Sequence, residues 1–302
     1  MTVIESTQAK LLIVGDLIVD ETWYVDSRKL SPEAPVPVAY LTTPKPHLSP
    51  GGASLAASYA HKQNYESVFL TAANRENRLW LEKKGIEIHS LEPIRNVTKT
   101  RYIDVNSNYH LLRVDNDEVV DFPVITPDRL RPVLEGLLDN ISCLVMLDYR
   151  KGIFLNTETT QMMIKLAVSK GIPVYVDTRC NVDKFRQSTF LKLNEKEYVA
   201  AAAAQDINTP QELCKKLNVP NVIITKGKLG AELYTITGNS YKYSPTVGKH
   251  TGTPDVTGCG DVFDVNFCYY YFKEGLQPTE VLELSVEKAT EYAYTSIGDR
   301  LC

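Results

Sequence analysis

Five short, uninterrupted apolar runs recur along the chain, and helical patterns occupy several of the intervals between them. The runs are residues 11–14, 68–70, 143–147, 174–176 and 222–225. Continuous apolar strands are typical of parallel sheets, because helices cover both faces of such a sheet. Helices are predicted at residues 54–62, 157–169, 195–204 and 210–217. This alternation predicts an α/β fold with a doubly wound, mostly parallel sheet.

Two segments, at about residues 23–41 and 98–115, depart from this alternation. The first contains Pro32, Pro35 and Pro37 among alternating apolar residues, and prolines at this density suit edge strands. The second alternates apolar and polar residues as well. We expect the two segments to form a small antiparallel β lid over one end of the α/β body. Since no repeat or disordered tract is visible, residues 1–302 are predicted to form a single domain.

Composition excludes several classes of function. The net charge of -4 gives no general basic field, so neither nucleic acid nor an anionic membrane is expected as a partner. The six cysteines contain no Cys-x-x-Cys pair, which argues against a zinc site and favours a reducing compartment. No signal peptide and no apolar run of about 20 residues is visible. We therefore predict a cytoplasmic protein.

The strongest chemical signal is the stretch DVTGCGD at residues 255–261, which precedes an apolar and aromatic segment. A glycine-rich turn that opens a helix directs backbone N–H groups and the positive helix end at an anion. Asp261 would lie at the mouth of this helix, where it could accept a proton from an attacking hydroxyl. An ordinary turn with an aspartate cap is the alternative interpretation.

Polar signals also follow the first predicted strand. Asp16 and Asp20 come after it, and carboxylates at the carboxyl end of a strand face the ligand crevice of an open α/β sheet. Gly51 and Gly52 open a predicted helix and would let a polar ligand approach the backbone. Each signal taken alone also fits a solvated loop.

In this order, the motifs resemble those of the ribokinase-like (PfkB) carbohydrate kinases over most of the chain. They are most similar to the bacterial kinases that phosphorylate D-glycero-D-manno-heptose 7-phosphate at the anomeric position. The residues that carry the likeness are Gly15-Asp16, Asp20, Trp23-Tyr24, residues 30–38, residues 50–53, residues 98–101, residues 112–115, Asp148-Tyr149, Lys151-Gly152, Asp177, Asn194-x-x-Glu197, residues 225–227, Gly230 and residues 255–261.

The resemblance implies a ribokinase-like fold and an enzyme that phosphorylates a sugar or sugar phosphate with ATP and Mg²⁺. It implies that Asp261 is the catalytic base, and that the anion hole is formed by Gly258, Cys259 and Gly260. The nucleotide would be held by Asn194, Glu197, Thr225, Gly227 and Gly230, and the metal would be held through water by Asn194 and Glu197. The sugar would face Asp16, Asp20, Gly51 and Gly52, and a sugar phosphate would face Arg101 and Arg113.

The assignment of Asn194 and Glu197 has a plain structural alternative, and the expected lid has a structural consequence. Asn194 and Glu197 would equally suit an ordinary helix N-terminus, where asparagine caps and glutamate favours the dipole. The edges of the lid need covering, so we expect two lids to pair and form a homodimer.

The chain departs from the family pattern mainly on the sugar side. Leu55 stands where the family commonly has an asparagine that helps to hold the sugar, and Cys259 replaces a small alanine. Arg179 and Lys192-Leu193 replace a lysine and a Thr-Pro pair of the heptose kinases, and the segment 71–80 is short. Two alternatives therefore stay open: a kinase for another small hydroxylated substrate, such as a nucleoside or an unphosphorylated sugar, and a non-catalytic member that acts as a binding protein.

Overall fold

The computed structural model describes residues 10–91, 97–116, 124–179, 181–246 and 254–295. The strands of its larger sheet are β1 (Lys10–Gly15), β5 (Ser67–Ala72), β6 (Ile88–Leu91), β9 (Ile141–Asp148), β10 (Val174–Thr178), β11 (Phe190–Asn194), β12 (Asn221–Thr225), β13 (Ala231–Thr235) and β14 (Ser240–Tyr243). Their order is β14-β13-β12-β11-β10-β9-β1-β5-β6. Pairing is parallel from β6 to β12 and antiparallel at β12–β13 and β13–β14. The predicted α/β class and mostly parallel sheet are confirmed.

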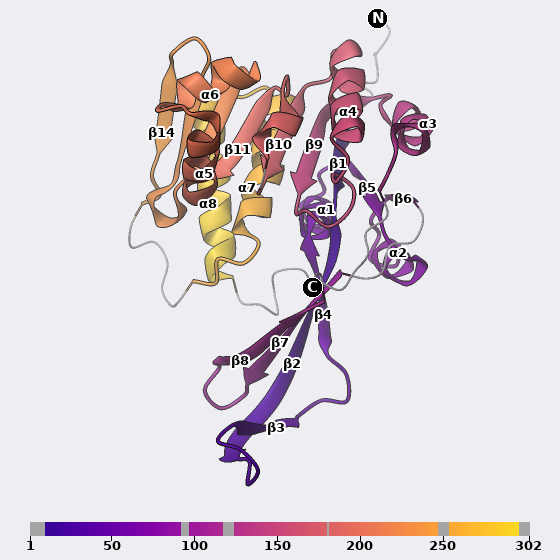
Figure 1. The fold of residues 1–302 in the computed structure, drawn as a ribbon, viewed down its shortest axis with the longest axis vertical. Coiled ribbons are helices and arrows are strands. Elements are labelled where there is room, and N and C mark those ends of the chain that lie inside the picture. Colours follow the sequence, from indigo (N-terminus) through magenta and orange to yellow (C-terminus); the bar gives the residue numbers. More distant parts are fainter. Residues whose placement is uncertain (1–9, 92–96, 117–123, 180, 247–253, 296–302) are drawn as a thin grey trace, which may run out of the picture.

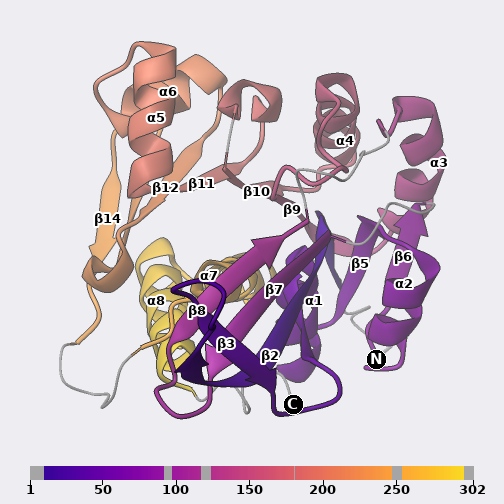
Figure 2. The ribbon, with the colours of Figure 1, turned by 60° about the horizontal axis from the view of Figure 1, so that its bottom comes forward.

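Helices cover both faces of this sheet (Figure 2). One layer contains α1 (Ala53–Lys62), α7 (Cys259–Cys268) and α8 (Pro278–Tyr294), and the other contains α3 (Pro127–Leu137), α4 (Thr157–Ser169), α5 (Glu195–Gln205) and α6 (Pro210–Leu217). α2 (Arg75–Glu82) lies beside β6, and the short helical segments are Val182–Phe185, Gly227–Leu229 and the π-helical Tyr269–Lys273. In the described part of the chain, no helix is both long enough and apolar enough to cross a membrane.

The two layers of helices explain why the predicted strands do not alternate between apolar and polar residues. Along β1, Leu11 and Ile13 pack into the core beneath α1 and α7, whereas Leu12 and Val14 pack into the core on the opposite face. Because both faces are buried, apolar residues are favoured at successive positions of such a strand. All five strands and all four helices predicted from the sequence are present, with α4 and α6 at the predicted bounds.

A second sheet projects from the α/β body as a lid (Figure 1). Its strands are β2 (Leu17–Leu30), β3 (Pro37–Leu41), β4 (His47–Gly52), β7 (Val97–Asp104) and β8 (His110–Asp115). The order is β3-β2-β7-β8, and β4 pairs with residues 17–22 in the first half of β2. Pro37 opens the edge strand β3, where a missing N–H is tolerated.

The lid differs from the prediction in three respects. It begins at Leu17, because the chain passes from β1 into β2 with only Asp16 between them. It includes β4, whose Pro-Gly-Gly sequence has little strand propensity. The lid is also not wholly antiparallel, since β2 and β7 pair in parallel. As β2 continues from the carboxyl end of β1, the lid stands over the edge of the sheet where α/β proteins bind ligands.

Candidate active site

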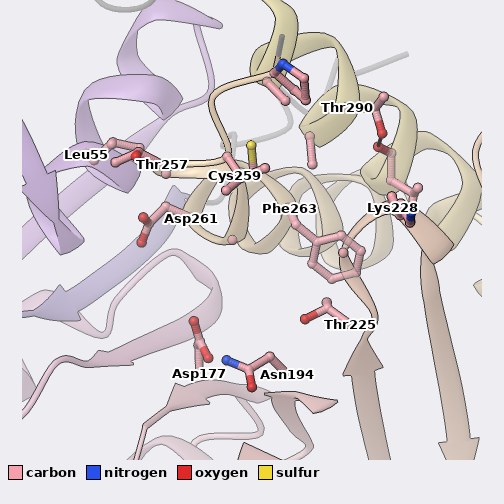
Figure 3. A pocket seen from close by; sticks show the side chains of 18 of the residues that line it. Leu55, Asp177, Asn194, Thr225, Lys228, Thr257, Cys259, Asp261, Phe263 and Thr290 are labelled. Carbon is pink, nitrogen blue, oxygen red and sulfur yellow. Dashed lines mark hydrogen bonds between the residues drawn. The ribbon is translucent and has the colours of Figure 1, made fainter. Parts of the chain in front are cut away.

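A cavity of about 1070 Å³ lies between the lid and the carboxyl ends of the parallel strands. Every predicted site residue except Asp16 lines it. Figure 3 shows Asp261 and Leu55 near the start of α7, with Asp177 and Asn194 on the facing strand ends. The fold therefore gathers motifs that are separated by more than 200 residues in the sequence around one space.

The catalytic turn opens α7. Gly258 is the N-cap residue with φ of 82°, a conformation that favours glycine. The N–H of Cys259 donates to the Val256 carbonyl at 3.2 Å. It is therefore not available to a ligand, in contrast to the predicted anion hole. The N–H groups of Gly258, Gly260 and Asp261 have no acceptor among the described residues. The last two belong to the first turn of the helix, at its positive end, and are open to an anion.

Asp261 is buried, and its Oδ1 accepts a hydrogen bond from the hydroxyl of Tyr149. Burial raises the pKa of the Asp261 carboxyl to about 6, while the Tyr149 hydrogen bond and the charge of Lys192 oppose that rise. A carboxyl with a pKa near neutrality is still ionised at pH 7 and is a stronger base than an ordinary aspartate. The arrangement suits removal of a proton from a hydroxyl.

Lys192, which the sequence reasoning gave no role, lies buried at the floor of the cavity. Its Nζ is 2.8 Å from Asp177 Oδ2 and 3.2 Å from Asp264 Oδ1. Burial alone would lower the pKa of Lys192, but the two carboxylates outweigh it and raise the pKa, so the lysine is charged. A Cβ built on Gly260 would be 3.2 Å from this Nζ, which places the cation directly beside the catalytic turn.

Asn194 and Glu197 have the geometry of the helix-cap alternative and also line the cavity. The Asn194 side chain accepts the Glu197 N–H at 3.0 Å, and Glu197 Oε2 accepts the Asn194 N–H at 2.7 Å. Burial raises the pKa of Glu197. Oε1 of Glu197 keeps its lone pairs, and carboxylate and amide oxygens are the ligands that Mg²⁺ prefers, often through water. Among the described residues no group of three or more His, Cys, Asp or Glu side chains could hold a metal directly, so these oxygens would contact Mg²⁺ only through water.

Another part of the cavity wall consists mainly of small residues. Thr225 ends β12, Gly227 opens the short helix Gly227–Leu229, and Gly230 follows it. α8 contributes lining side chains that sequence reasoning missed, namely Val286, Ala289, Thr290 and Ala293. Their spacing of three and four residues marks one face of a helix, and this signal could have identified them. Small apolar walls of this kind suit a flat aromatic base.

The lid side of the cavity is basic. Arg101 Nη1 lies 2.8 Å from Asp20 Oδ1, and Arg113 pairs with Asp115 at 2.6 Å. Lys99 also lines the cavity and has no ion-pair partner among the described residues. Burial lowers the pKa of Lys99, and the nearby Arg179 and Arg113 act in the same direction. Side chains two residues apart on a strand point to the same face, and residues 99 and 101 are two apart on β7. The sequence could therefore have predicted that Lys99 lies beside Arg101.

Asp16 is the predicted sugar-side residue that does not reach the cavity. Its carboxylate is buried and accepts backbone N–H groups from Tyr149 at 3.0 Å, Lys151 at 2.9 Å and Ile153 at 3.2 Å. Burial and the neighbouring Asp148 raise its pKa to about 6, although the three N–H groups oppose this. In this structure Asp16 fixes the loop after β9.

Comparison with known proteins identifies the family of the chain. The profile of the pfkB family carbohydrate kinases matches residues 9–301. Among curated proteins, the chain is 28% identical over 263 residues to the Bifunctional protein HldE of Nitratiruptor sp., covering 83% of this chain and 54% of that protein. It is 30% identical over 268 residues to the HldE protein of Pasteurella multocida, covering 85% and 54%. The chain thus spans about half the length of the curated relatives it matches.

Solved structures share the fold. Phosphofructokinase-2 from Escherichia coli in complex with potassium has a TM-score of 0.72 at 17% identity, covering 97% of this chain and 95% of that one. Arabidopsis thaliana ribokinase complexed with ribose and ATP has a TM-score of 0.70 at 17% identity, covering 96% and 94%. Because the family profile spans nearly the whole chain, this protein belongs to the pfkB family of carbohydrate kinases, which are phosphotransferases that act on hydroxyl groups.

Proposed function

We propose that the protein transfers the γ-phosphate of ATP to a hydroxyl of a sugar or sugar phosphate, with the anomeric hydroxyl of a heptose 7-phosphate as the first candidate. The observation that carries this proposal is the position of Asp261. Its buried carboxylate lies at the start of α7, next to the N–H groups of Gly260 and Asp261, which have no acceptor among the described residues, and it lines the same cavity as the basic residues of the lid.

Each group of residues has a separate role in the proposed reaction. The carboxylate of Asp261 accepts the proton of the acceptor hydroxyl as its oxygen attacks the γ-phosphorus, and ADP leaves from the opposite side. The N–H groups of Gly260 and Asp261 and the charge of Lys192 stabilise negative charge that develops on the transferring oxygens. Asn194 and Glu197 would hold Mg²⁺ through water, and the bound ion would neutralise phosphate charge. Thr225, Gly227 and Gly230 lie along the nucleotide.

The acceptor side favours a phosphorylated sugar. Lys99, Arg101 and Arg113 line the lid wall, where Asp20 pairs with Arg101 and Asp115 pairs with Arg113. Lys99 is then the one of the three cations without an ion-pair partner among the described residues. A phosphate group is the ligand whose oxygens pair well with several such cations. The carboxylate of Asp20 and the backbone of Gly51 and Gly52 are then left to contact sugar hydroxyls. The HldE relatives support a heptose phosphate, at about 30% identity.

The test is ATP turnover against a panel of sugar phosphates, unphosphorylated sugars and nucleosides. Asp261→Asn keeps the shape of the side chain but removes its basicity, so kcat should fall by about 10²–10⁴-fold while the affinity for ATP stays nearly constant. Asp139→Asn, which alters an exposed carboxyl outside the cavity, serves as the control. Near-normal turnover by Asp261→Asn would refute the mechanism.

The panel also separates the open alternatives. Preference for nucleosides or unphosphorylated sugars would support a different small substrate of the same fold. Binding of ATP without turnover of any acceptor would support a non-catalytic binding protein. The single-domain organisation and the cytoplasmic location remain predictions.

We further propose that the protein forms a homodimer through its lid. Large apolar side chains are exposed on lid strands and their connections, and these residues are Leu30, Val36, Tyr40, Leu41, Leu48, Leu111, Leu112 and Val114. Several exposed apolar residues on one small sheet favour pairing with a second copy. Light scattering should give twice the mass of the chain, and a monomer at micromolar concentration would contradict the proposal.

A further inference from the structure

Tyr149, immediately after β9, is attached at three points around the catalytic base. Its backbone N–H donates to Asp16 Oδ2 at 3.0 Å, and its hydroxyl donates to Asp261 Oδ1. The face of its ring lies against Arg179, whose guanidinium carbon is 4.1 Å from the ring centroid. With 8% of its surface exposed, Tyr149 is nearly enclosed, yet it lines the cavity.

The backbone of this loop is fixed before any ligand binds. Asp16 also accepts the N–H groups of Lys151 and Ile153, so one buried carboxylate holds three residues of a five-residue stretch. Asp148 Oδ1 accepts the N–H of Arg150 at 2.8 Å, which adds a second restraint on the same turn. The position of the Tyr149 hydroxyl is therefore set by the fold and not by a substrate.

We propose that Tyr149 is a positioning residue for phosphoryl transfer. Its hydroxyl binds Oδ1 of Asp261, which leaves Oδ2 to face the acceptor hydroxyl. Asp16 affects Asp261 indirectly, because it holds the backbone of Tyr149. A carboxylate bound at one oxygen by a rigid donor loses the freedom to rotate, which is a form of preorganisation. The inference rests on the proposed kinase activity and goes beyond it, since neither Asp16 nor Tyr149 need touch the substrate.

Removal of the Tyr149 hydroxyl has a distinct electrostatic signature. The charged groups that face Asp261 are Lys192 on β11, Arg179 and Asp177 at the end of β10, and Asp264 on α7 itself. Tyr149→Phe changes none of these charges and removes only a neutral donor. Since the donor favours the ionised form of Asp261, its loss should raise the pKa of that carboxyl above its present value of about 6.

The same core contains a matched control. Tyr175 on β10 donates its hydroxyl to Asp264 Oδ1 at 2.7 Å, one helical turn from the Tyr149–Asp261 pair. Both tyrosines are buried and both bind an aspartate of α7, but neither Tyr175 nor Asp264 lines the cavity. Tyr175→Phe therefore removes an equivalent buried hydrogen bond without touching the base.

The experiment follows the Asp261 carboxyl by ¹³C NMR in protein labelled at aspartate Cγ, with the signal assigned by its loss in Asp261→Asn. We expect its pKa to rise by about one unit in Tyr149→Phe, the size of shift that a hydrogen bond to a charged group commonly supports, and to stay unchanged in Tyr175→Phe. In parallel, the acidic limb of kcat/KM for the acceptor should move to higher pH by the same amount in Tyr149→Phe, with KM for ATP unchanged.

Two results would overturn the inference: an equal Asp261 pKa in Tyr149→Phe and the unmodified protein, or an equal rise in both tyrosine variants, which would indicate general loosening of the core. The NMR readout does not depend on turnover. Absence of turnover in the unmodified protein, with the Asp261 shift in Tyr149→Phe preserved, would therefore count against the proposed function while the Tyr149–Asp261 relationship stands.

Discussion

Leu55 on α1 lies against Gly258 at the start of α7, so closely that a Cβ built on Gly258 would be 2.7 Å from Leu55 Cδ1. The position of the catalytic turn is thus defined by an apolar contact with another helix. Leu55 lines the cavity but offers no hydrogen bond to a sugar. In the proposed function, polar contacts to the sugar would come from the lid and from the backbone of Gly51 and Gly52.

This contact predicts the effect of Gly258→Ala. A side chain at φ of 82° is strained, and the added methyl group would also meet Leu55, so we expect a loss of more than about 1–2 kcal/mol in the free energy of unfolding and reduced turnover. Gly238→Ala is the control, because Gly238 has φ of 98° with nothing within 4 Å of its Cβ position. Urea unfolding of both variants separates strain from contact; equal losses would show that Leu55 does not constrain the turn.

Replacement of Asp16 tests whether it holds a loop or a sugar. In Asp16→Asn, an amide NH₂ faces backbone N–H groups that now donate to a carboxylate, so we expect a lower Tm and a lower kcat, with roughly 1–3 kcal/mol of stability lost. Steady-state kinetics should show little change in KM for the acceptor. A selective rise in that KM, with stability and kcat preserved, would instead make Asp16 a sugar ligand.

Lys99 provides the test for a phosphorylated acceptor. Lys99→Met keeps much of the packing but removes one cation from the lid wall, so KM for a sugar phosphate should rise by about 10-fold or more. KM for an unphosphorylated sugar should barely change. Lys29→Met, on the exposed end of β2 and outside the cavity, controls for a general effect on the lid. Equal effects on both classes of sugar would remove the phosphate from the proposal.

Much of this fold could be predicted from the sequence because it depends on local patterns. Apolar runs such as 143–147 report strands buried on both faces, and Pro210 after a threonine marks a helix start. β4 escaped prediction because its strand state depends on pairing with β2, not on its own Pro-Gly-Gly sequence. Pairing across the lid is a tertiary effect that overrides propensity.

The candidate site, like the fold, has parts that sequence patterns predict and parts that depend on tertiary contacts. The motif residues of the catalytic turn and the strand ends gather as expected, since parallel strands present their carboxyl ends at one edge of the sheet. The roles of Asp16 and Lys192 depended on three-dimensional neighbours that no spacing reveals. A carboxylate after a strand fits a sugar ligand and a loop anchor equally well, and only the three N–H groups that surround Asp16 distinguish the two roles.

The last prediction concerns stability and pH. Burial raises the pKa values of Asp16 and Asp261 from 3.8 to about 6, so the folded protein binds these two protons more tightly than the unfolded chain does. Their contribution to stability is therefore fully present below about pH 4 and is lost as the pH rises through 6. Carboxyls with lowered pKa values, such as Glu232 at about 2, lose their contribution only below about pH 4.5 and do not act in this window.

Asp261→Asn isolates one of the two groups. A shift of about two pKa units corresponds to roughly 2–3 kcal/mol at neutral pH, so the variant should gain up to that amount of stability over the unmodified protein as the pH rises from about 4 to about 6.5. Urea unfolding across this range measures the difference. Asp139→Asn, at an exposed carboxyl paired with Lys170, should show no such trend. If the unmodified protein instead gains stability relative to Asp261→Asn as the pH rises, the fold stabilises the carboxylate, and the base would not carry the raised pKa on which the proposed proton transfer depends.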